Sequence, residues 1–354
     1  MNKQAVQTPA AAPEGAERRY EVVVVGGGTA GLSGALTLAR ARRSVLVIDA
    51  GRPRNAPAAG VHMYLGREGT PPADLLAAGR AEAAGYGAEI VTGTAVTAEH
   101  AGEGGFRVLL EDGTAVLADR LLVTTGLTDE LPTVPGLAER WGRDVLHCPY
   151  CHGWEVRDQA IGVLATGPFA VHQALLWRQW SENVTLFLNT AFKPDDEECE
   201  RLAARDVTVV DGEVSALEVT GDRLTGLRLA DGRVVPVDAL VTATRLTGGA
   251  GLLAGLGLEP VEQEMFGQVI GTGVPADPYG KTSVPGVWVA GNVTNLTDQV
   301  IGAAAAGVRA GAALNADLIA EETRRAVAAR RAPASPRAER EDGERALGDH
   351  GRER

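Results

Sequence analysis

The sequence of 354 residues contains only three cysteines, too few for a fold stabilised by several disulfides, which indicates a compartment that keeps thiols reduced. It also lacks an uncharged apolar run long enough to span a membrane, because Arg309 interrupts the small-residue stretch 301–313. Positive charge is scarce: 34 Lys and Arg against 46 Asp and Glu give a formal net charge of -12. This balance argues against nucleic acid or an anionic membrane as the main partner. We therefore expect a cytoplasmic protein that binds neither.

Both ends of the chain have the composition of unfolded segments. Residues 1–19 are rich in Ala and Pro and lack the apolar segment of a signal peptide, so we expect a disordered leader. Residues 323–354 mix many Arg with acidic residues and hold no aromatic side chain, so we expect a helical extension that passes into a charged, disordered tail. The length and the 45% of hydrophobic residues predict about two folded domains, each with its own core.

What the sequence does contain is a pair of closely spaced cysteines. Cys148 and Cys151 lie in H-C-P-Y-C-H-G, residues 147–153, a spacing that lets a disulfide open and close within one helical turn. The helix dipole favours the thiolate of a cysteine at a helix start, which makes Cys148 the expected nucleophile. His147 and His152 titrate near neutrality and are expected to move the proton that thiol–disulfide exchange shifts. The motif predicts redox chemistry at sulfur, with these two cysteines and two histidines as the catalytic residues.

Three other interpretations of this motif are weaker. A zinc site needs about four ligands, and the third cysteine, Cys199, lies apart in an acidic run, so we expect no metal. The string C-P-Y-C-H matches the attachment pattern of c-type haem, but that chemistry normally requires export. A purely structural disulfide over so short a loop gains little stability. We expect Cys199 to have no part in the chemistry.

A dinucleotide fingerprint stands near the start of the chain. A β-branched run, residues 20–25, leads into G-G-G-T-A-G and a helical pattern, and a second β-branched run ends at Asp49. Gly26 permits the tight turn, Gly28 lets the backbone approach a pyrophosphate, and Gly31 lets the helix and strand pack closely. Asp49 stands where an acid that binds ribose is expected. We therefore predict that a dinucleotide binds here.

A second strand–turn–helix pattern begins near residue 160, but its fingerprint is damaged. Ala165 replaces the first glycine, Gly167 and Ala170 hold the other two positions, and Pro168 stands between them. After the following strand, where an Arg or Lys would meet the 2′-phosphate of NADP, no basic residue occurs before Lys193. Either this domain binds a pyridine nucleotide poorly, or it keeps the shape of such a domain without its ligand. We do not expect NADPH as a cofactor.

The remaining pattern suggests two copies of one architecture. Turn signals at 111–114 and 230–233 are flanked by alternating strands, and each is followed by a buried-strand run. The segment V-P-G-V-W-V-A-G-N at 284–292 leads into a small-residue helix and is expected to complete the first domain after the chain has made the second. We predict an α/β fold of two Rossmann-like nucleotide-binding domains of the three-layer ββα type, the second inserted in the first.

Over residues 20 to 320 the chain resembles the low-molecular-weight thioredoxin reductase family of FAD-dependent disulfide oxidoreductases. The resemblance is carried, in order, by G-G-G-T-A-G, T-T-G at 124–126, C-P-Y-C-H-G, and K-T-S-V-P-G-V-W-V-A-G-N at 281–292 with Gln299 beyond it. It implies a homodimer that binds FAD, with the dithiol facing the flavin ring. By this resemblance the FAD-binding residues are Gly26, Gly28, Gly31, Asp49, Val96, Thr125, Gly126, Gly291, Asn292, Gln299 and Val300.

The resemblance also implies domain boundaries. Residues 20–128 and 248–322 would form a discontinuous FAD-binding domain. Residues 129–247 would form an NAD(P)-binding-like domain that carries the cysteine pair and has a degenerate nucleotide site.

Departures from the reductase pattern favour a particular branch. The family usually has an acid after the second cysteine and an Asp before the last helix, where this chain has His152 and Asn292. Together with the degenerate NADPH site, these changes resemble the dithiol oxidases of the gliotoxin and holomycin type. This implies oxidation of a small dithiol to a disulfide, with dioxygen as electron acceptor.

Two other functions stay open. One is a thioredoxin reductase-like enzyme that takes electrons from NAD(P)H or ferredoxin and reduces a disulfide in a small molecule or a thioredoxin-like protein. The other is a non-catalytic flavin redox sensor. The histidines outside the motif, His62, His100, His172 and His350, are expected at solvent or core positions, and Glu155 is expected on a helix surface.

Overall fold

The computed structural model describes residues 17–102, 104–249 and 251–331. Most of the expected leader, and the expected tail beyond Arg331, lie outside the described residues. The described residues divide into two compact units, with the division between residues 312 and 313. The sheets, the cavity and the site described below all belong to the first unit.

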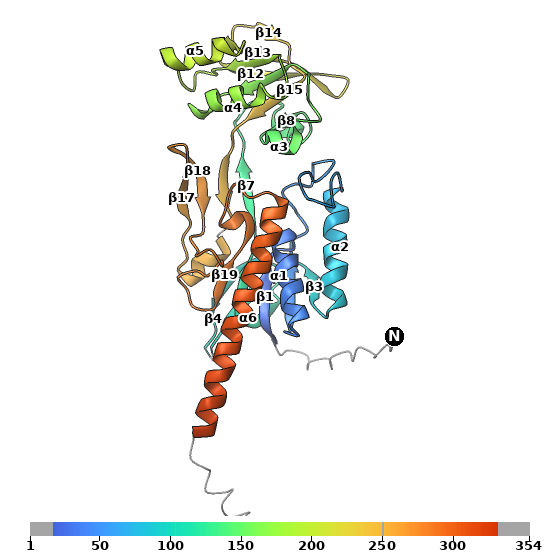
Figure 1. The fold of residues 1–354 in the computed structure, drawn as a ribbon, viewed down its shortest axis with the longest axis vertical. Helices are drawn as coiled ribbons and strands as arrows, with labels where there is room; N and C mark the ends of the chain where they lie inside the picture. The colour runs from blue at the N-terminus through green and yellow to red at the C-terminus, as the bar shows by residue number, and fades with distance from the viewer. Residues whose placement is uncertain (1–16, 103, 250, 332–354) are drawn as a thin grey trace, which may run out of the picture. The chain divides into compact units, whose positions relative to one another are not determined.

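A parallel sheet with the glycine-rich turn after its central strand begins the fold (Figure 1). The central strand, β1, buries Val22, Val23 and Val24 completely, as expected for a strand covered on both faces. It begins two residues before the predicted start, because Arg18 already pairs in register with Val116. In spatial order the parallel strands are β3 (Glu89–Thr92), β2 (Val45–Asp49), β1 (Arg18–Val25), β6 (Ala115–Val123) and β19 (Val287–Val289).

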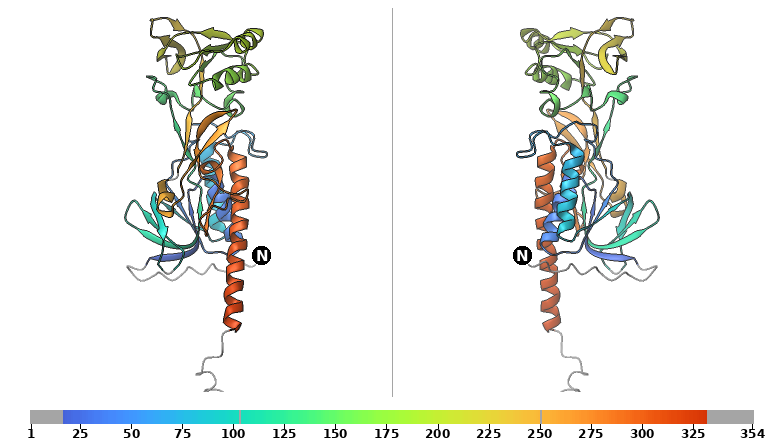
Figure 2. Two further views of the ribbon diagram at one scale, coloured as in Figure 1. Left: turned by 90° about the vertical axis from the view of Figure 1, so that its left-hand side faces the viewer. Right: turned by 90° about the vertical axis from the view of Figure 1, so that its right-hand side faces the viewer.

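This sheet lies between a helical layer and an antiparallel layer. The helices α1 (Thr29–Arg40) and α2 (Pro72–Gly85) lie side by side on one face of the sheet (Figure 2). On the other side, β4 (Ala95–His100) and β5 (Phe106–Leu110) continue from β6 as an antiparallel meander. The three layers confirm the predicted ββα architecture.

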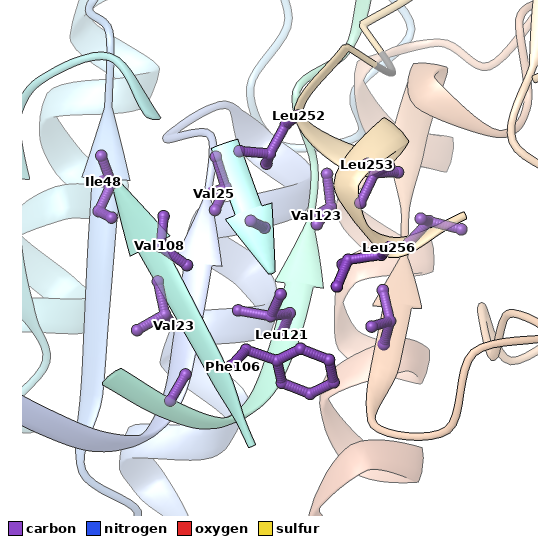
Figure 3. Close-up of a cluster of buried hydrophobic side chains, with 14 of the residues drawn as sticks. Val23, Val25, Ile48, Phe106, Val108, Leu121, Val123, Leu252, Leu253 and Leu256 are labelled. Carbon is purple, nitrogen blue, oxygen red and sulfur yellow. The ribbon is translucent and has the colours of Figure 1, made fainter. Parts of the chain in front are cut away.

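The core of this domain fills the space between the parallel strands and the meander (Figure 3). Val23 and Val25 of β1 face Phe106 and Val108 of β5, and all four side chains are buried. The short helix η2 (Gly251–Leu256) closes the core with three buried leucines, although it comes more than a hundred residues later in the chain. The core is therefore built from two segments of the chain, one on each side of the second sheet in sequence.

The predicted turn at 111–114 is present between β5 and β6. The amide of Leu110 donates to the carbonyl of Thr114 at 2.8 Å, and Gly113 takes a φ of 86°. Such a positive φ favours glycine, which explains the D-G signal.

The second domain repeats the arrangement with a smaller sheet. Its parallel strands, in spatial order, are β11 (Thr208–Val210), β10 (Val184–Phe187), β9 (Ile161–Leu164), β15 (Ala239–Thr242) and β8 (Val145–Leu146). The helices are α3 (Pro149–His152), α4 (Phe169–Trp177) and α5 (Asp196–Ala204). The antiparallel strands β12 (Val214–Thr220), β13 (Arg223–Leu229) and β14 (Val234–Val235) form a sheet with the predicted turn at 230–233.

Two antiparallel strands carry the chain into and out of this second domain. They are β7 (Leu127–Glu130) and β16 (Arg245–Gly248), and they share a sheet with the hairpin of β17 (Val261–Met265) and β18 (Gln268–Gly273). The expected domain boundaries, at residues 128/129 and 247/248, fall inside this strand pair. The connection between the domains is thus a hydrogen-bonded ladder.

The 3-10 turns η1 (Ala138–Arg140) and η3 (Gly291–Val293) and the long helix α6 (Val300–Arg331) complete the elements. Gly307 of α6 packs against the backbone of α1, because a Cβ there would lie 2.0 Å from the carbonyl oxygen of Ala30. Within the described ranges, no helix has both the length and the apolar character needed to cross a bilayer.

Candidate active site

Cys148 and Cys151 are joined by a disulfide at the start of α3. Their Cα atoms are 5.3 Å apart, and Cys148 is the residue immediately before the helix, with extended backbone. The amides of Cys151 and His152 both donate to the carbonyl of Cys148 at 3.2 Å. This turn places both sulfurs next to one another, as the spacing predicts. Cys199 is apart from them, on α5, with its thiol directed at the carbonyl of Pro194.

The dithiol and the glycine loop after β1 line one cavity of about 920 Å³. This volume lies in the usual range of about 300–1,000 Å³ for ligand sites. Of the eleven predicted cofactor-binding residues, all but Gly31 and Val96 line it. The nine are Gly26, Gly28, Asp49, Thr125, Gly126, Gly291, Asn292, Gln299 and Val300.

The glycine loop has the geometry that a pyrophosphate requires. Gly26 has a φ of 108°, and a Cβ there would lie 2.4 Å from the carbonyl oxygen of Thr124. A Cβ on Gly28 would meet nothing within 4 Å, so the backbone is open to a ligand at the start of α1. Gly31 is absent from the cavity wall because it packs the helix on the strand: its Cβ would lie 1.9 Å from the carbonyl oxygen of Gly26. The residues present fit a dinucleotide.

Asp49 ends β2 and is buried at the cavity wall. One carboxylate oxygen accepts from the amide of Gly51 at 3.0 Å, and the other is paired with Arg80 of α2. A Cβ on Gly27 would lie 2.5 Å from the carboxyl carbon of Asp49, so this glycine leaves room for the acid. Arg80 was not predicted, because nothing in the sequence connects it to a residue 31 positions earlier.

Val96 was expected to contact the adenine through its backbone. Val96 is 40% exposed and is not part of the cavity wall. The two preceding residues, Thr94 and Ala95, line the cavity instead. The expected strand is present as β4, but its first residue is the one closest to the site.

Asn292 orders the loop that leads into α6. Its side-chain amide donates to the carbonyls of Asn295 at 3.0 Å and Asp298 at 2.9 Å, with a longer contact of 3.4 Å to Leu296. A carboxylate at this position would face carbonyl oxygens and could donate no hydrogen bond to them. The need for a donor explains the asparagine. Beside it, burial raises the pKa of Asp298, against the opposing charge of Arg309.

An ion pair that the sequence did not reveal lies next to the dithiol. Arg54, in the segment after β2, makes a bidentate pair with Asp129 of β7, with contacts of 2.6 and 2.7 Å. Thr244 donates to the same carboxylate at 2.8 Å. Burial raises the pKa of Asp129, but these hydrogen bonds and the charge of Arg54 outweigh it and leave the pKa lowered. All three residues line the cavity.

Arg54 also fixes the tautomer of His147, and burial fixes its charge. A guanidinium nitrogen lies 3.3 Å from Nε2 of His147, and because arginine only donates, Nε2 must be an acceptor. Desolvation lowers the pKa of His147 to about 4, assisted by the charge of Arg54 and opposed by Asp129. His147 is therefore neutral near neutral pH, with its proton on Nδ1.

His152, the last residue of α3, is under different influences. Burial lowers its pKa, the carboxylate of Glu155 raises it, and His62 lowers it again. His152 and His62 both line the cavity. The charged group that acts on His152 is thus a carboxylate, whereas the one in contact with His147 is a guanidinium.

Comparison with known proteins gives consistent results. The profile of the family described as pyridine nucleotide-disulphide oxidoreductase matches residues 20–314. Thioredoxin reductase tcpT of Claviceps purpurea is 31% identical over 317 residues, which cover 84% of this chain and 95% of that protein.

Two solved structures have a similar fold. The crystal structure of HlmI has a TM-score of 0.81 and 45% identity, covering 89% of this chain and 96% of that one. The oxidoreductase from Agrobacterium tumefaciens has a TM-score of 0.79 and 35% identity, covering 85% and 99%. These likenesses extend over both domains and confirm the two-domain Rossmann-type fold.

Proposed function

The chain belongs to the pyridine nucleotide-disulphide oxidoreductase family, and we propose that it is an FAD-dependent enzyme that oxidises a small dithiol to a disulfide, with dioxygen as electron acceptor. The observation that carries this proposal is the shared cavity. The redox pair Cys148–Cys151 and the dinucleotide loop line the same space, which supports direct exchange of electrons between the sulfurs and the cofactor.

The residues that would hold FAD follow from the cavity wall. The open backbone at Gly28 would receive the pyrophosphate, and Asp49 stands at the expected position of the ribose. Gly291, Asn292 and Gln299 would contact the flavin half. When bound, FAD would supply an acceptor for the two electrons of the reduced sulfur pair and a route for them to dioxygen, which with two protons would give hydrogen peroxide.

The sulfur chemistry takes two exchange steps. A substrate thiolate attacks the sulfur of Cys148, the disulfide to Cys151 breaks, and Cys151 leaves as a thiolate. The second substrate thiolate then attacks the substrate sulfur of the mixed disulfide and releases Cys148. The substrate loses two electrons and two protons and becomes a disulfide, while Cys148 and Cys151 become the reduced pair.

His152 is the residue that takes the thiol proton in this proposal. His147 is adjacent to Cys148, but its Nε2 is occupied by Arg54 and its pKa is low. We assign His147 the role of a neutral neighbour that Arg54 holds in one orientation. General-base assistance of the kind assigned to His152 contributes about a hundred- to ten-thousandfold.

The second fingerprint supports a reaction without NADPH. Pro168 stands directly before α4 and has no amide proton to donate to a phosphate. Phe169, the first residue of the helix, stacks on Phe266 of the β17–β18 hairpin, with ring centroids 6.0 Å apart. An aromatic pair thus lies beside the helix start where a pyrophosphate would bind.

A second candidate is reduction of a disulfide, with electrons that enter from NAD(P)H or ferredoxin. It is favoured by the relative tcpT, which bears the name thioredoxin reductase. The two directions use the same cysteines and cofactor, so the electron donor and the electron acceptor separate them.

Oxygen uptake by the purified holoprotein tests the proposal. We expect dithiothreitol, used as a model dithiol, to cause oxygen consumption and peroxide formation, and Cys148→Ser or Cys151→Ser to abolish both. Reduction of a thioredoxin-like protein by NADPH, without oxygen uptake from the dithiol, would favour the second candidate and overturn the first.

A further inference from the structure

A chain of titratable side chains connects the dithiol helix with the loop between β2 and α2. His62 is the centre of this chain: its Nδ1 lies 2.6 Å from the carboxylate of Glu68, and its Nε2 lies 3.5 Å from the carboxylate of Glu155. Glu155 follows His152 by three residues and acts on it electrostatically. Both histidines line the cavity that contains the disulfide.

The loop is built to hold this pair. The amide of Val61 donates to the carbonyl of Thr70 at 2.8 Å, which closes the loop on itself. Glu68 is folded back so that one oxygen meets His62 and the other accepts from the amide of Met63 at 2.9 Å. A carboxylate held in this way fixes the orientation of the imidazole, as carboxylate–histidine pairs do elsewhere.

The three side chains beyond His152 are all partly exposed to solvent. The side chain of His62 is 22% exposed and that of Glu68 is 65% exposed. Glu155, between the two histidines, has 44% of its side chain exposed. A proton that arrives at His152 therefore has a sequence of acceptors that ends in solvent.

Resting on the function proposed above, we propose that His62, held by Glu68, is a second proton-transfer residue that returns the substrate thiol proton to solvent. The thiol gives its proton to His152, His152 gives it to Glu155, and Glu155 gives it to Nε2 of His62. The ring then releases this proton from Nε2 to water, while the proton on Nδ1 stays against Glu68, so His62 keeps its starting tautomer. One proton enters and one leaves, so the four side chains return to their starting charges after each transfer.

This role differs from the expectation that His62 occupies an inert position and that Glu155 is only a surface residue. No sequence motif joins the two, because they lie on different segments and meet only in the fold. The i,i+3 spacing of His152 and Glu155 is visible in the sequence. The contact of Glu155 with His62 is visible only in the fold.

The test measures the disulfide itself rather than turnover. Purified holoprotein is mixed with dithiothreitol without oxygen, thiols are trapped by alkylation at set times, and mass spectrometry gives the rate at which Cys148–Cys151 opens. His62→Gln and Glu155→Gln are compared with the parent in dilute buffer and in concentrated imidazole. His100→Gln is the control, because His100 lies on β4 against Phe106, outside the cavity wall.

We expect His62→Gln and Glu155→Gln each to slow opening at least about tenfold in dilute buffer, and imidazole to restore the rate to near that of the parent. His100→Gln should match the parent in both buffers. Equal rates in dilute buffer, or a slow rate that imidazole does not restore, would overturn the relay. If dithiothreitol fails to open the disulfide of the parent protein, the proposed function fails, which is a separate result.

Discussion

At the scale of single residues, the two histidines beside the dithiol differ because of what faces them. Burial keeps His147 neutral, and the contact in which it accepts from Arg54 fixes its tautomer. His152 is under the influence of Glu155 instead. Both histidines could be predicted from their adjacency to the cysteines, but Arg54 stands 93 positions before His147 and carries no motif. The division of roles therefore depends on a contact that only the fold creates.

Because the pKa of His147 is low, we predict a specific dependence of the unfolding free energy on pH. The folded pKa of about 4 lies below the unfolded value of 6.5, so below pH 6.5 the unfolded state binds a proton that the folded state does not. His147 therefore costs stability as the pH falls from 6.5 towards 4. His147→Gln keeps an acceptor for Arg54 but cannot titrate. We expect the parent to lose about 2 kcal/mol more unfolding free energy than this variant between about pH 7 and pH 5.

Urea unfolding of both proteins at the two pH values is the measurement. The difference between the two proteins removes the contribution of the carboxylates, which both share. Equal losses in parent and variant would show that His147 is not held neutral.

At the scale of elements, the turn between β1 and α1 contains two glycines with different roles. A Cβ on Gly31 would strike the carbonyl of Gly26, whereas a Cβ on Gly28 would point into open space. We expect Gly31→Ala to lower the unfolding free energy by about 1–3 kcal/mol. We expect Gly28→Ala to change stability by less than about 1 kcal/mol but to weaken FAD binding at least about tenfold.

Denaturant unfolding and flavin titration of the two matched variants test this pair. We expect Gly31→Ala to lower stability and Gly28→Ala to weaken FAD binding. A Gly28→Ala protein with unchanged FAD affinity would contradict the placement of the pyrophosphate at this turn.

The loop between η3 and α6 gives a second prediction at this scale. Asn292 donates to the carbonyls of Asn295 and Asp298, and Asn292→Asp would replace the donor by a charge that repels them. We expect a loss of about 1–3 kcal/mol in unfolding free energy. Asn295→Asp is the matched control, because its side-chain oxygen already accepts from Thr297. Similar melting behaviour of the two variants would disprove the role given to the Asn292 amide.

At the scale of the whole molecule, sequence reasoning succeeds where neighbours in the chain act together. The glycine turn, Asp49 and the cysteine pair each depend on residues within one strand–turn–helix unit, and the cavity contains all three. The turn signals at 111–114 and 230–233 likewise depend on local backbone preferences, and both hairpins are present.

Sequence reasoning fails where a contact joins distant segments. Arg54 reaches Asp129 over 75 positions, and Arg80 reaches Asp49 over 31. The stacking of Phe266 on Phe169 brings the β17–β18 hairpin onto α4, at the helix start where the damaged fingerprint stands. Such pairs have no signature in one sequence, because their geometry follows from how the sheets and the strand ladder of β7 and β16 are assembled.

The central claim is that electrons enter this protein through Cys148 and Cys151 and leave to dioxygen. Anaerobic rapid mixing of the holoprotein with dithiothreitol, with NADPH and with reduced ferredoxin, followed by admission of air, tests it most directly. We predict that the visible flavin bands disappear with dithiothreitol alone and return in air with formation of peroxide. Rapid loss of the bands with NADPH or ferredoxin, together with no change on addition of the dithiol, would contradict it.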